Sequence, residues 1–386
     1  MKTPKSFAPS PPTPLPRAGE GSVVADDANT IAARPLDGYF FEDYQLGQHF
    51  IHATPRTITA GDSALYLALT GARQPLHCSL QVAQALGYRD MPLDDLLVFN
   101  IAFGKTVPDI SYNAIANLGY ADVRFLAPVY VGDTLRSETQ IIGLKEKSNG
   151  KSGVVYVRSD TFRQDGEKML TWARWVMISK REISKREIST IGTAAASEKT
   201  LPDLPAFVTA ENIVVPKQLR PAGLNAHDSG STRLWDDYAS GEVIDHPAGM
   251  TIDESQHTLA TRLYQNNARV HFDAHHMATT PFGKRLVYGG HVISICRALS
   301  YDGLENVISI AAINAGSHVH PTFAGDTLYA KTQVLEKWAL RPDLGALRLR
   351  LLGLKNLTAG EYALPADIAV PQLVLDLDYT VLLPRK

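Results

Sequence analysis

The second half of this sequence repeats landmarks of the first half at an almost constant distance. Asp43 and Tyr44 return as Asp237 and Tyr238, an offset of 194 residues. The same offset relates His52 to His246, Thr57 to Thr251 and His77 to His271, and an offset of 193 relates Gly132-Asp-Thr-Leu135 to Gly325-Asp-Thr-Leu328. An offset that stays this constant over about 90 residues indicates two tandem copies of one domain. Any fold proposed for the chain must therefore contain two copies of the same domain.

Each copy contains one strongly apolar run, residues 96–103 in the first and 292–299 in the second. Both runs are apolar on almost every side, which favours a helix enclosed by a sheet over a helix lying on a surface. Other segments have the composition or the period-two alternation typical of strands. These segments are residues 154–157, 172–178, 347–351 and 375–381. The pattern predicts an α+β tandem (double) hot-dog fold, in which each half wraps a long antiparallel sheet around one central apolar helix.

The repeat also divides the chain into domains. Residues 1–37 are rich in proline and small polar residues, a composition that cannot bury enough apolar surface to fold, so we expect a disordered tail. The first hot-dog domain is expected at 38–181 and the second, catalytic one at 219–386. Residues 182–218 between them are expected to be a charged and polar linker.

Glycines suggest where chain turns fall within each copy. A short opening strand is expected to end near Gly47 and again near Gly241. The turns at Gly132 and Gly325 are expected to close hairpins, which is why neither is included in a candidate site.

The composition limits the class of protein. Of the 386 residues, 45% are hydrophobic and 20% charged, with a formal net charge of −2, as in soluble globular proteins. That charge argues against a nucleic-acid-binding surface and against a basic membrane-binding face. Only Cys78 and Cys296 are present, without metal-ligand spacing, so we expect no metal site and no disulfide framework, in a reducing cytoplasm. No apolar run is long enough to span a membrane, and the N-terminus lacks the apolar core of a signal peptide.

The residues best suited to chemistry lie just before the second apolar run. His271 and Asp273 are followed by Pro281-Phe-Gly283 and then by Gly289 and Gly290, where the helix is expected to begin. The N-terminus of a helix offers free backbone N–H groups to a developing negative charge. This stretch therefore combines an imidazole, a carboxylate and a candidate oxyanion site.

The same stretch resembles the signature of the MaoC-like, R-specific enoyl-CoA hydratases. The resemblance implies that water is added to the double bond of a 2-enoyl-CoA thioester, with coenzyme A present only as part of the substrate and no other cofactor. Such a reaction needs a base for the water, an acid for the α-carbon, and donors for the thioester oxygen as it gains enolate charge. The match implies that His271 is the acid/base group and that Gly289, with Gly290 behind it, holds the thioester oxygen.

The sequence departs from that signature at one important position. Asn266 stands five residues before His271, where the family has an aspartate. An amide can hold a water molecule by hydrogen bonds but cannot accept its proton. Either His271 handles protons alone, or another carboxylate contributes, and Asp273 is the nearest in sequence.

The first copy departs further. It keeps His77, but Ala72 stands at the acid position and Asp95 stands where the second copy has Gly289. A carboxylate there would repel an enolate oxygen rather than stabilise it. We therefore expect the active centre in the second copy and a structural, substrate-enclosing role for the first.

Three basic residues are candidates for substrate contacts. Arg297 lies within the second apolar run, where an unpaired guanidinium would be costly. It could bind a substrate carboxylate, although structural pairing is the interpretation we favour. Lys284 and Arg285 could meet the phosphates of coenzyme A, or they could simply be solvated.

The long match at residues 103–120, together with 41–48 and 52–59, resembles the mesaconyl-CoA hydratase branch of this family. The expected function is therefore that of a hydro-lyase which reversibly converts mesaconyl-CoA to β-methylmalyl-CoA. Two alternatives stay open. A hot-dog acyl-CoA thioesterase would use a carboxylate near the central helix, such as Asp94 or Asp95, and the missing aspartate at position 266 would suit a non-catalytic acyl-CoA-binding protein. Pairing of two chains into a homodimer is also left open.

Overall fold

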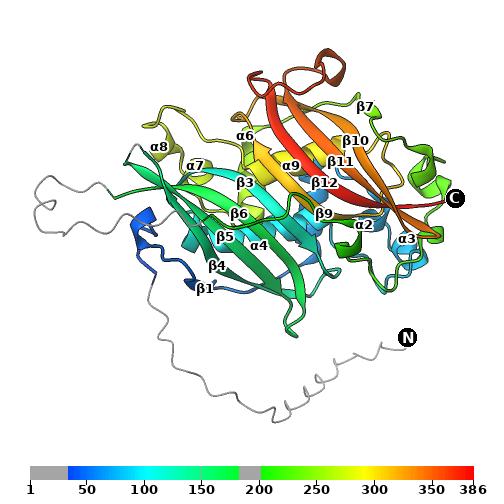
Figure 1. Ribbon diagram of the computed structural model, residues 1–386, viewed down its shortest axis with the longest axis horizontal. Helices are drawn as coiled ribbons and strands as arrows, with labels where there is room; N and C mark the ends of the chain where they lie inside the picture. Colours follow the sequence, from blue (N-terminus) through cyan, green and yellow to red (C-terminus); the bar gives the residue numbers. More distant parts are fainter. Residues whose placement is uncertain (1–33, 149, 182–200) are drawn as a thin grey trace, which may run out of the picture. The chain divides into compact units, whose positions relative to one another are not determined.

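The computed structural model describes residues 34–148, 150–181 and 201–386 (Figure 1). Most of the expected tail, residues 1–33, and the first part of the expected linker, residues 182–200, lie outside the described residues. Pro35–Lys386 form one compact unit, which contains both copies of the repeat.

The two copies contain matching helices and strands. The first copy has η1 (Phe41–Asp43), β1 (His49–Ile51), β2 (Arg56–Thr57), α1 (Ala60–Thr70), α2 (Pro75–Cys78), α3 (Leu80–Ala85), α4 (Asp95–Ile110), β3 (Ala114–Phe125), β4 (Thr134–Glu146), β5 (Ser152–Phe162) and β6 (Lys168–Ser179). The described part of the linker has η2 (Ala210–Asn212), and the second domain opens with η3 (Pro221–Gly223) and α5 (Ala226–Ser229). The second copy has η4 (Trp235–Asp237), β7 (Val243–Asp245), β8 (Met250–Thr251), α6 (Glu254–Leu263), α7 (Arg269–Phe272), α8 (Ala274–Met277), α9 (Gly289–Leu299), β9 (Ser309–His318), β10 (Thr327–Arg341), β11 (Leu344–Lys355), η5 (Ala359–Glu361) and β12 (Leu373–Pro384).

The strands of both copies form one continuous antiparallel sheet. Its order is β1-β4-β5-β6-β3-β9-β12-β11-β10-β7, with β2 beside β4 and β8 beside β10. The copies join where β3 pairs with β9, for example Tyr120 with Gly316 and Val123 with Ile313. Figure 1 shows the sheet curving over the long helices α4 and α9. The predicted double hot-dog fold, with its sheets joined edge to edge, is confirmed.

The two apolar runs form the central helices, as predicted. Asp94 caps α4 by accepting a hydrogen bond from the Leu96 N–H at 2.9 Å. The two helices contact each other through Asn100 and Ser294, which are 194 residues apart in sequence. Asn100 Nδ2 donates to Ser294 Oγ at 3.0 Å. Equivalent positions of the two copies therefore meet at the centre of the fold, as they do across a twofold axis.

The same internal hydrogen bonds recur in both copies. His52 Nε2 lies 2.7 Å from Thr139 Oγ1, and His246 Nε2 lies 2.8 Å from Thr332 Oγ1. Since neither histidine faces the cavity described below, their repetition reflects a shared way of fixing the first strand of each copy to the sheet.

Two local expectations, each made for both copies, were wrong. The segments before Gly47 and Gly241 are short 3₁₀ helices, and strands β1 and β7 begin after these glycines. The turns at Gly132 and Gly325 are not hairpins, because β3 and β4, like β9 and β10, are not neighbours in the sheet. Both glycines have positive φ, 94° and 95°, which explains why glycine suits the turn.

The described part of the linker, residues 201–218, packs against the protein. Val208 is buried, and its N–H donates to Asn314 Oδ1 at 2.9 Å. The Phe207 ring stacks on Trp338 with centroids 6.1 Å apart. Val214 and Pro216 line a small cavity beside His77 of the first copy. This part of the linker therefore contacts both copies rather than lying wholly in solvent.

Candidate active site

One cavity of about 220 Å³ contains three of the predicted site residues, Asn266, His271 and Gly289. Its other walls come from both copies. The first copy contributes Phe103, Ser111, Asn117, Tyr120 and Arg174, and the second adds Phe282, Tyr288, His318 and His320. No aspartate or glutamate of the described residues lines it. The two halves together therefore enclose one largely apolar space with a few polar groups, as ligand sites commonly do.

His271 is held in one orientation by a backbone carbonyl. Its Nδ1 lies 3.0 Å from the Leu286 carbonyl oxygen and therefore donates a hydrogen bond to it. In the neutral ring Nε2 is then an acceptor, and it has no hydrogen-bond partner among the described residues. Burial lowers the pKa of His271 to about 4. The imidazole is consequently neutral near pH 7, with a free lone pair available to accept a proton.

Asn266 faces the same cavity and is only 1% exposed. Its Oδ1 accepts a hydrogen bond from the Ala268 N–H at 3.2 Å, which fixes the amide. The structure gives its Nδ2 no partner within the described ranges, so this group remains a donor for water or substrate. The side chain can orient a ligand but cannot take a proton from it.

Gly289 begins α9, and its backbone N–H has no acceptor among the described residues. A Cβ at this position would lie 2.3 Å from Nε2 of His318, so only glycine permits this approach. Gly290 does not line the cavity. Its carbonyl accepts from Ser294 Oγ at 2.9 Å, and a Cβ there would lie 2.1 Å from Asn100 Oδ1, so Gly290 serves the contact between α9 and α4.

His318 is a cavity residue that sequence reasoning missed. Its Nε2 lies 3.1 Å from the Tyr120 hydroxyl, and burial lowers the pKa of His318 to about 4. At the offset of 193 its counterpart in the first copy is Phe125. A closer comparison of the two repeats could have found this residue, because one copy has a histidine where the other has a phenylalanine.

Asp273 does not join His271. It is exposed, and its carboxylate caps α8 by accepting from the His276 N–H at 2.9 Å. Asp273 is absent from the cavity wall. The candidate catalytic role for Asp273 is therefore not supported, because its side chain is engaged at a helix N-terminus outside the site.

The three basic candidates lie outside the cavity wall as well. Arg297 is 6% exposed and donates to Ser300 Oγ at 3.3 Å. With the Gln74 amide oxygen turned toward it, its two terminal nitrogens lie 2.8 and 2.9 Å from that oxygen. The geometry thus favours the structural interpretation of Arg297.

Lys284 and Arg285 differ in their surroundings. Lys284 is exposed, with Nζ 4.5 Å from the centroid of Phe323. The Phe323 ring contacts Phe282 in the cavity wall, so Lys284 lies near the edge of the site. Arg285 forms an ion pair with Glu254. Because the Arg285 guanidinium is already paired, the Lys284 ammonium group is the better candidate for binding a phosphate.

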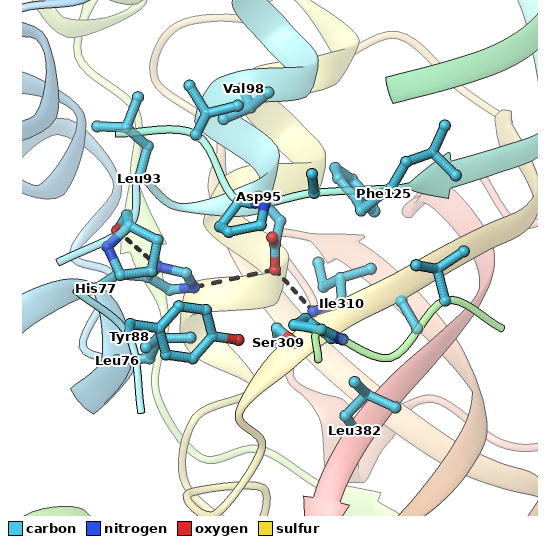
Figure 2. Close-up of a pocket in the computed structure, with 18 residues that line it drawn as sticks. Leu76, His77, Tyr88, Leu93, Asp95, Val98, Phe125, Ser309, Ile310 and Leu382 are labelled. Atoms are coloured by element: carbon cyan, nitrogen blue, oxygen red, sulfur yellow. Dashed lines mark hydrogen bonds and ion pairs between the residues drawn. The ribbon is translucent and has the colours of Figure 1, made fainter. Parts of the chain in front are cut away.

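The equivalent place in the first copy is nearly filled (Figure 2). His77 Nδ1 lies 3.1 Å from the Pro92 carbonyl oxygen, as His271 does from that of Leu286. Asp95 Oδ2 accepts from the Ile310 N–H at 2.7 Å and lies 3.9 Å from His77 Nε2. The remaining cavity measures about 40 Å³.

In the first copy the Asp95 side chain therefore fills the space that corresponds to the open space beside Gly289 in the second copy. Burial raises the pKa of Asp95 to about 6, the direction expected for a carboxylate with little solvent. Asp94 is also engaged, as the α4 cap and as the acceptor from the Tyr66 hydroxyl at 3.0 Å. Neither carboxylate reaches the larger cavity.

Comparisons with known proteins agree with one another. The family model described as mesaconyl-CoA hydratase matches residues 24–350. The chain is 51% identical to a β-methylmalyl-CoA dehydratase of Chloroflexus aurantiacus, over 92% of this chain and 100% of the relative. It is 49% identical to a mesaconyl-CoA hydratase of Cereibacter sphaeroides, over 90% of this chain and 98% of the relative.

Solved structures support the same grouping. A MaoC domain protein dehydratase from Chloroflexus aurantiacus superposes with a TM-score of 0.84 at 50% identity, covering 92% of this chain and all of that one. A Mycobacterium tuberculosis protein with a double hotdog fold, at 24% identity and a TM-score of 0.70, covers 91% of this chain and 100% of that one and shows the fold alone. The match of the family model over most of the chain, together with two relatives near 50% identity, shows that the chain belongs to the mesaconyl-CoA hydratase family.

Proposed function

We propose that this chain is a hydro-lyase that reversibly adds water to an enoyl-CoA thioester, with mesaconyl-CoA and β-methylmalyl-CoA as the substrate pair. The observation that carries the proposal is the open cavity in which His271 Nε2 and the Gly289 N–H are both unpaired among the described residues. The names of the relatives near 50% identity supply the substrate.

In the proposed reaction the thioester oxygen accepts a hydrogen bond from Gly289 at the start of α9. His271 Nε2 removes a proton from water, and the water oxygen bonds to the β-carbon. The electrons of the double bond move to the thioester oxygen as an enolate. The imidazolium then returns its proton to the α-carbon, which restores the thioester and completes the addition.

This scheme asks His271 to act as base and then as acid. No carboxylate within the described ranges lines the cavity, so the schemes with a second carboxylate lose their candidate. Asn266 Nδ2 is suited to hold the water oxygen while His271 accepts the proton. His318, beside Gly289, is suited to support the thioester end of the substrate.

The thioesterase alternative loses its distinguishing feature. It depended on Asp94 or Asp95, and both are engaged elsewhere in the fold. The alternative of a non-catalytic acyl-CoA-binding protein depended on the missing aspartate, and the oriented His271 provides another route for the proton.

One assay separates the three functions. The protein is incubated with mesaconyl-CoA while enoyl-thioester absorbance and free thiol are both followed. Loss of absorbance without thiol means hydration, release of thiol means hydrolysis, and binding without either change means a binding protein. Only the first result supports the proposal, and the other two reject it.

The remaining expectations have separate tests. If no metal or redox cofactor takes part, dialysis against a chelator should leave the hydration rate within about twofold of the untreated value. Light scattering would test the homodimer, and fractionation of the source cells would test the cytoplasmic location. Within the described residues, no helix is long and apolar enough to cross a membrane.

A further inference from the structure

A buried arginine of the first copy faces the cavity of the second. Arg174 lies on β6, is 1% exposed and forms part of the cavity wall. Its Nη2 donates to Thr106 Oγ1 at 2.8 Å, and both terminal nitrogens lie 3.4 Å from Ser111 Oγ. Its guanidinium carbon lies 4.1 Å from the centroid of the Phe103 ring. All of these contacts are to neutral groups.

Within the part of the chain that the structure describes, no carboxylate forms an ion pair with this guanidinium. Arg174 has no ion pair with any aspartate or glutamate that the structure describes, and its Nε is buried without a hydrogen-bond partner. The carboxylate of Asp109, on neighbouring α4, lies 2.7 Å from His52 Nδ1. Burial lowers the pKa of Arg174 to about 10, so the group stays charged near pH 7. A buried charge without a counter-charge is costly unless something compensates for it.

A short series of ring contacts connects Arg174 to His271. The Phe103 ring, which the guanidinium covers, lies 5.5 Å from the ring of Tyr288. The Tyr288 ring lies 5.5 Å from that of His271. The charged group and the candidate base therefore border one cavity, two aromatic contacts apart.

Other polar groups of the same wall are also unpaired. Both side-chain polar atoms of Asn117 and the hydroxyl of Tyr288 are buried without hydrogen-bond partners within the described ranges. Native proteins rarely leave so many buried polar atoms unpaired at one place unless a ligand or water pairs with them. Arg174, Asn117 and Tyr288 thus form a donor-rich region with no acid in it.

We propose that Arg174 binds the free carboxylate of the substrate, and so selects enoyl thioesters of dicarboxylic acids over those of monocarboxylic acids. The inference rests on the proposed hydratase function and names the group that Arg174 recognises. In mesaconyl-CoA that carboxylate is attached to the carbon that receives the hydroxyl group. Because Arg174 and His271 line the same cavity, a bound substrate can meet both, and the planar guanidinium suits a carboxylate.

The second copy offers a matched comparison. Arg297 is also a buried arginine, on the central helix α9, but Gln74 and Ser300 satisfy its guanidinium and it does not reach the cavity. Arg297 shows that this fold can pair a buried arginine internally. Arg174 lacks that internal pairing, which favours a ligand as its partner.

The test compares two substrates that differ only in the group of interest. In tiglyl-CoA a methyl group replaces the free carboxylate of mesaconyl-CoA, and the rest of the acyl chain is the same. The kcat/KM of each substrate is measured for the parent, for Arg174→Gln and for the control Arg297→Gln. The parent should prefer mesaconyl-CoA. Arg174→Gln should reduce that preference on the order of 10- to 100-fold, the loss expected for a hydrogen bond between charged groups.

The outcomes separate this inference from the function on which it rests. A parent that hydrates neither substrate rejects the proposed function itself. A parent that hydrates mesaconyl-CoA, with a preference unchanged in Arg174→Gln or with equal losses on both substrates, rejects only the role of Arg174. Arg297→Gln should lower stability without changing the preference, and a change there as large as in Arg174→Gln would also reject the assignment.

A second variant keeps the test decisive if Arg174→Gln does not fold. Arg174→Lys retains the charge but loses the paired N–H groups, so it should raise the KM for mesaconyl-CoA several-fold and leave that for tiglyl-CoA unchanged. Calorimetric binding of the unreactive pair 2-methylsuccinyl-CoA and 2-methylbutyryl-CoA should show the same selective loss. Equal binding of that pair by the parent protein would overturn the proposal.

Discussion

At the scale of single residues, His271 has the two properties that proton transfer needs, a fixed ring and a free nitrogen. Replacing it with alanine should lower the hydration rate by about 10²–10⁴, the usual loss for a positioned acid/base group. The comparison is kcat/KM for mesaconyl-CoA in the parent and in His271→Ala, with circular dichroism as the folding control. Activity within about threefold of the parent would contradict the assignment.

The buried imidazoles predict how stability depends on pH. The pKa of His271 and that of His318 are both lowered to about 4, whereas an unfolded histidine titrates near 6.5. As pH falls below about 6.5 the unfolded chain takes up protons that the folded chain does not, so stability is lost between about pH 6.5 and 4. Urea unfolding at pH 7.5 and 5 should show this loss, and His271→Gln should reduce it by about 2 kcal/mol. An identical loss in the variant would contradict the pKa direction.

Asn266 should position water without moving its proton. Asn266→Ala should slow hydration roughly tenfold, because it removes a neutral hydrogen bond, and should fall well short of the His271→Ala effect. Asn266→Asp should be tolerated and should add an ionisation to the acid side of the pH–rate profile. If Asn266→Asp instead abolishes binding of mesaconyl-CoA but spares crotonyl-CoA, the amide contacts the substrate carboxylate and the water-orienting role is wrong.

Sequence reasoning reached some of these residues and not others, for a physical reason. The match to a family motif led to His271, Asn266 and Gly289, which lie close together in the chain and in the cavity. Asp273 also lies close in the chain, but it is the exposed N-cap of a new helix that begins three residues after His271. Arg174 and His318 come from strands far away in sequence, and only the strand order brings them to the site.

At the scale of elements, the start of α9 is the most constrained point. An alanine at 289 would place a Cβ 2.3 Å from His318 Nε2, so the histidine or the helix must move. Gly289→Ala should therefore lower kcat by about 10²–10³, the loss typical of a disturbed oxyanion donor. Gly360→Ala is the matched control, because a Cβ there meets nothing within 4 Å. Equal activities of the two variants would mean that the N–H of residue 289 has no role.

Helices and strands were more predictable than their connections. The apolar runs and the period-two segments correctly indicated α4, α9, β5, β6, β11 and β12. Local sequence could not show that the glycine turns lead to distant strands, since strand order depends on the whole sheet. Nor could it show that Val208 of a polar-looking linker finds a place on the second copy.

At the scale of the whole molecule, the two copies should contribute unequally. His77 faces Asp95 in a cavity of about 40 Å³, whereas His271 faces an open one of about 220 Å³. His77→Ala should change kcat/KM less than about threefold, far less than the loss of 10² or more expected for His271→Ala. Equal losses from the two variants would show that both places are catalytic.

The joining of β3 to β9 in one chain has a consequence for how such a site can change over generations. In a symmetric homodimer every substitution appears at both sites at once, so a gain at one site is also imposed on the other. In this fused chain the equivalent positions of the two copies mutate independently. Phe125 is the equivalent of His318 in the first copy. Tyr379 is the equivalent of Arg174 in the second copy, because Tyr379 pairs with Ile313 as Arg174 pairs with Tyr120. Tandem fusion lets one half specialise in supporting the other, so selectivity can be refined on one side without compromising a twin site.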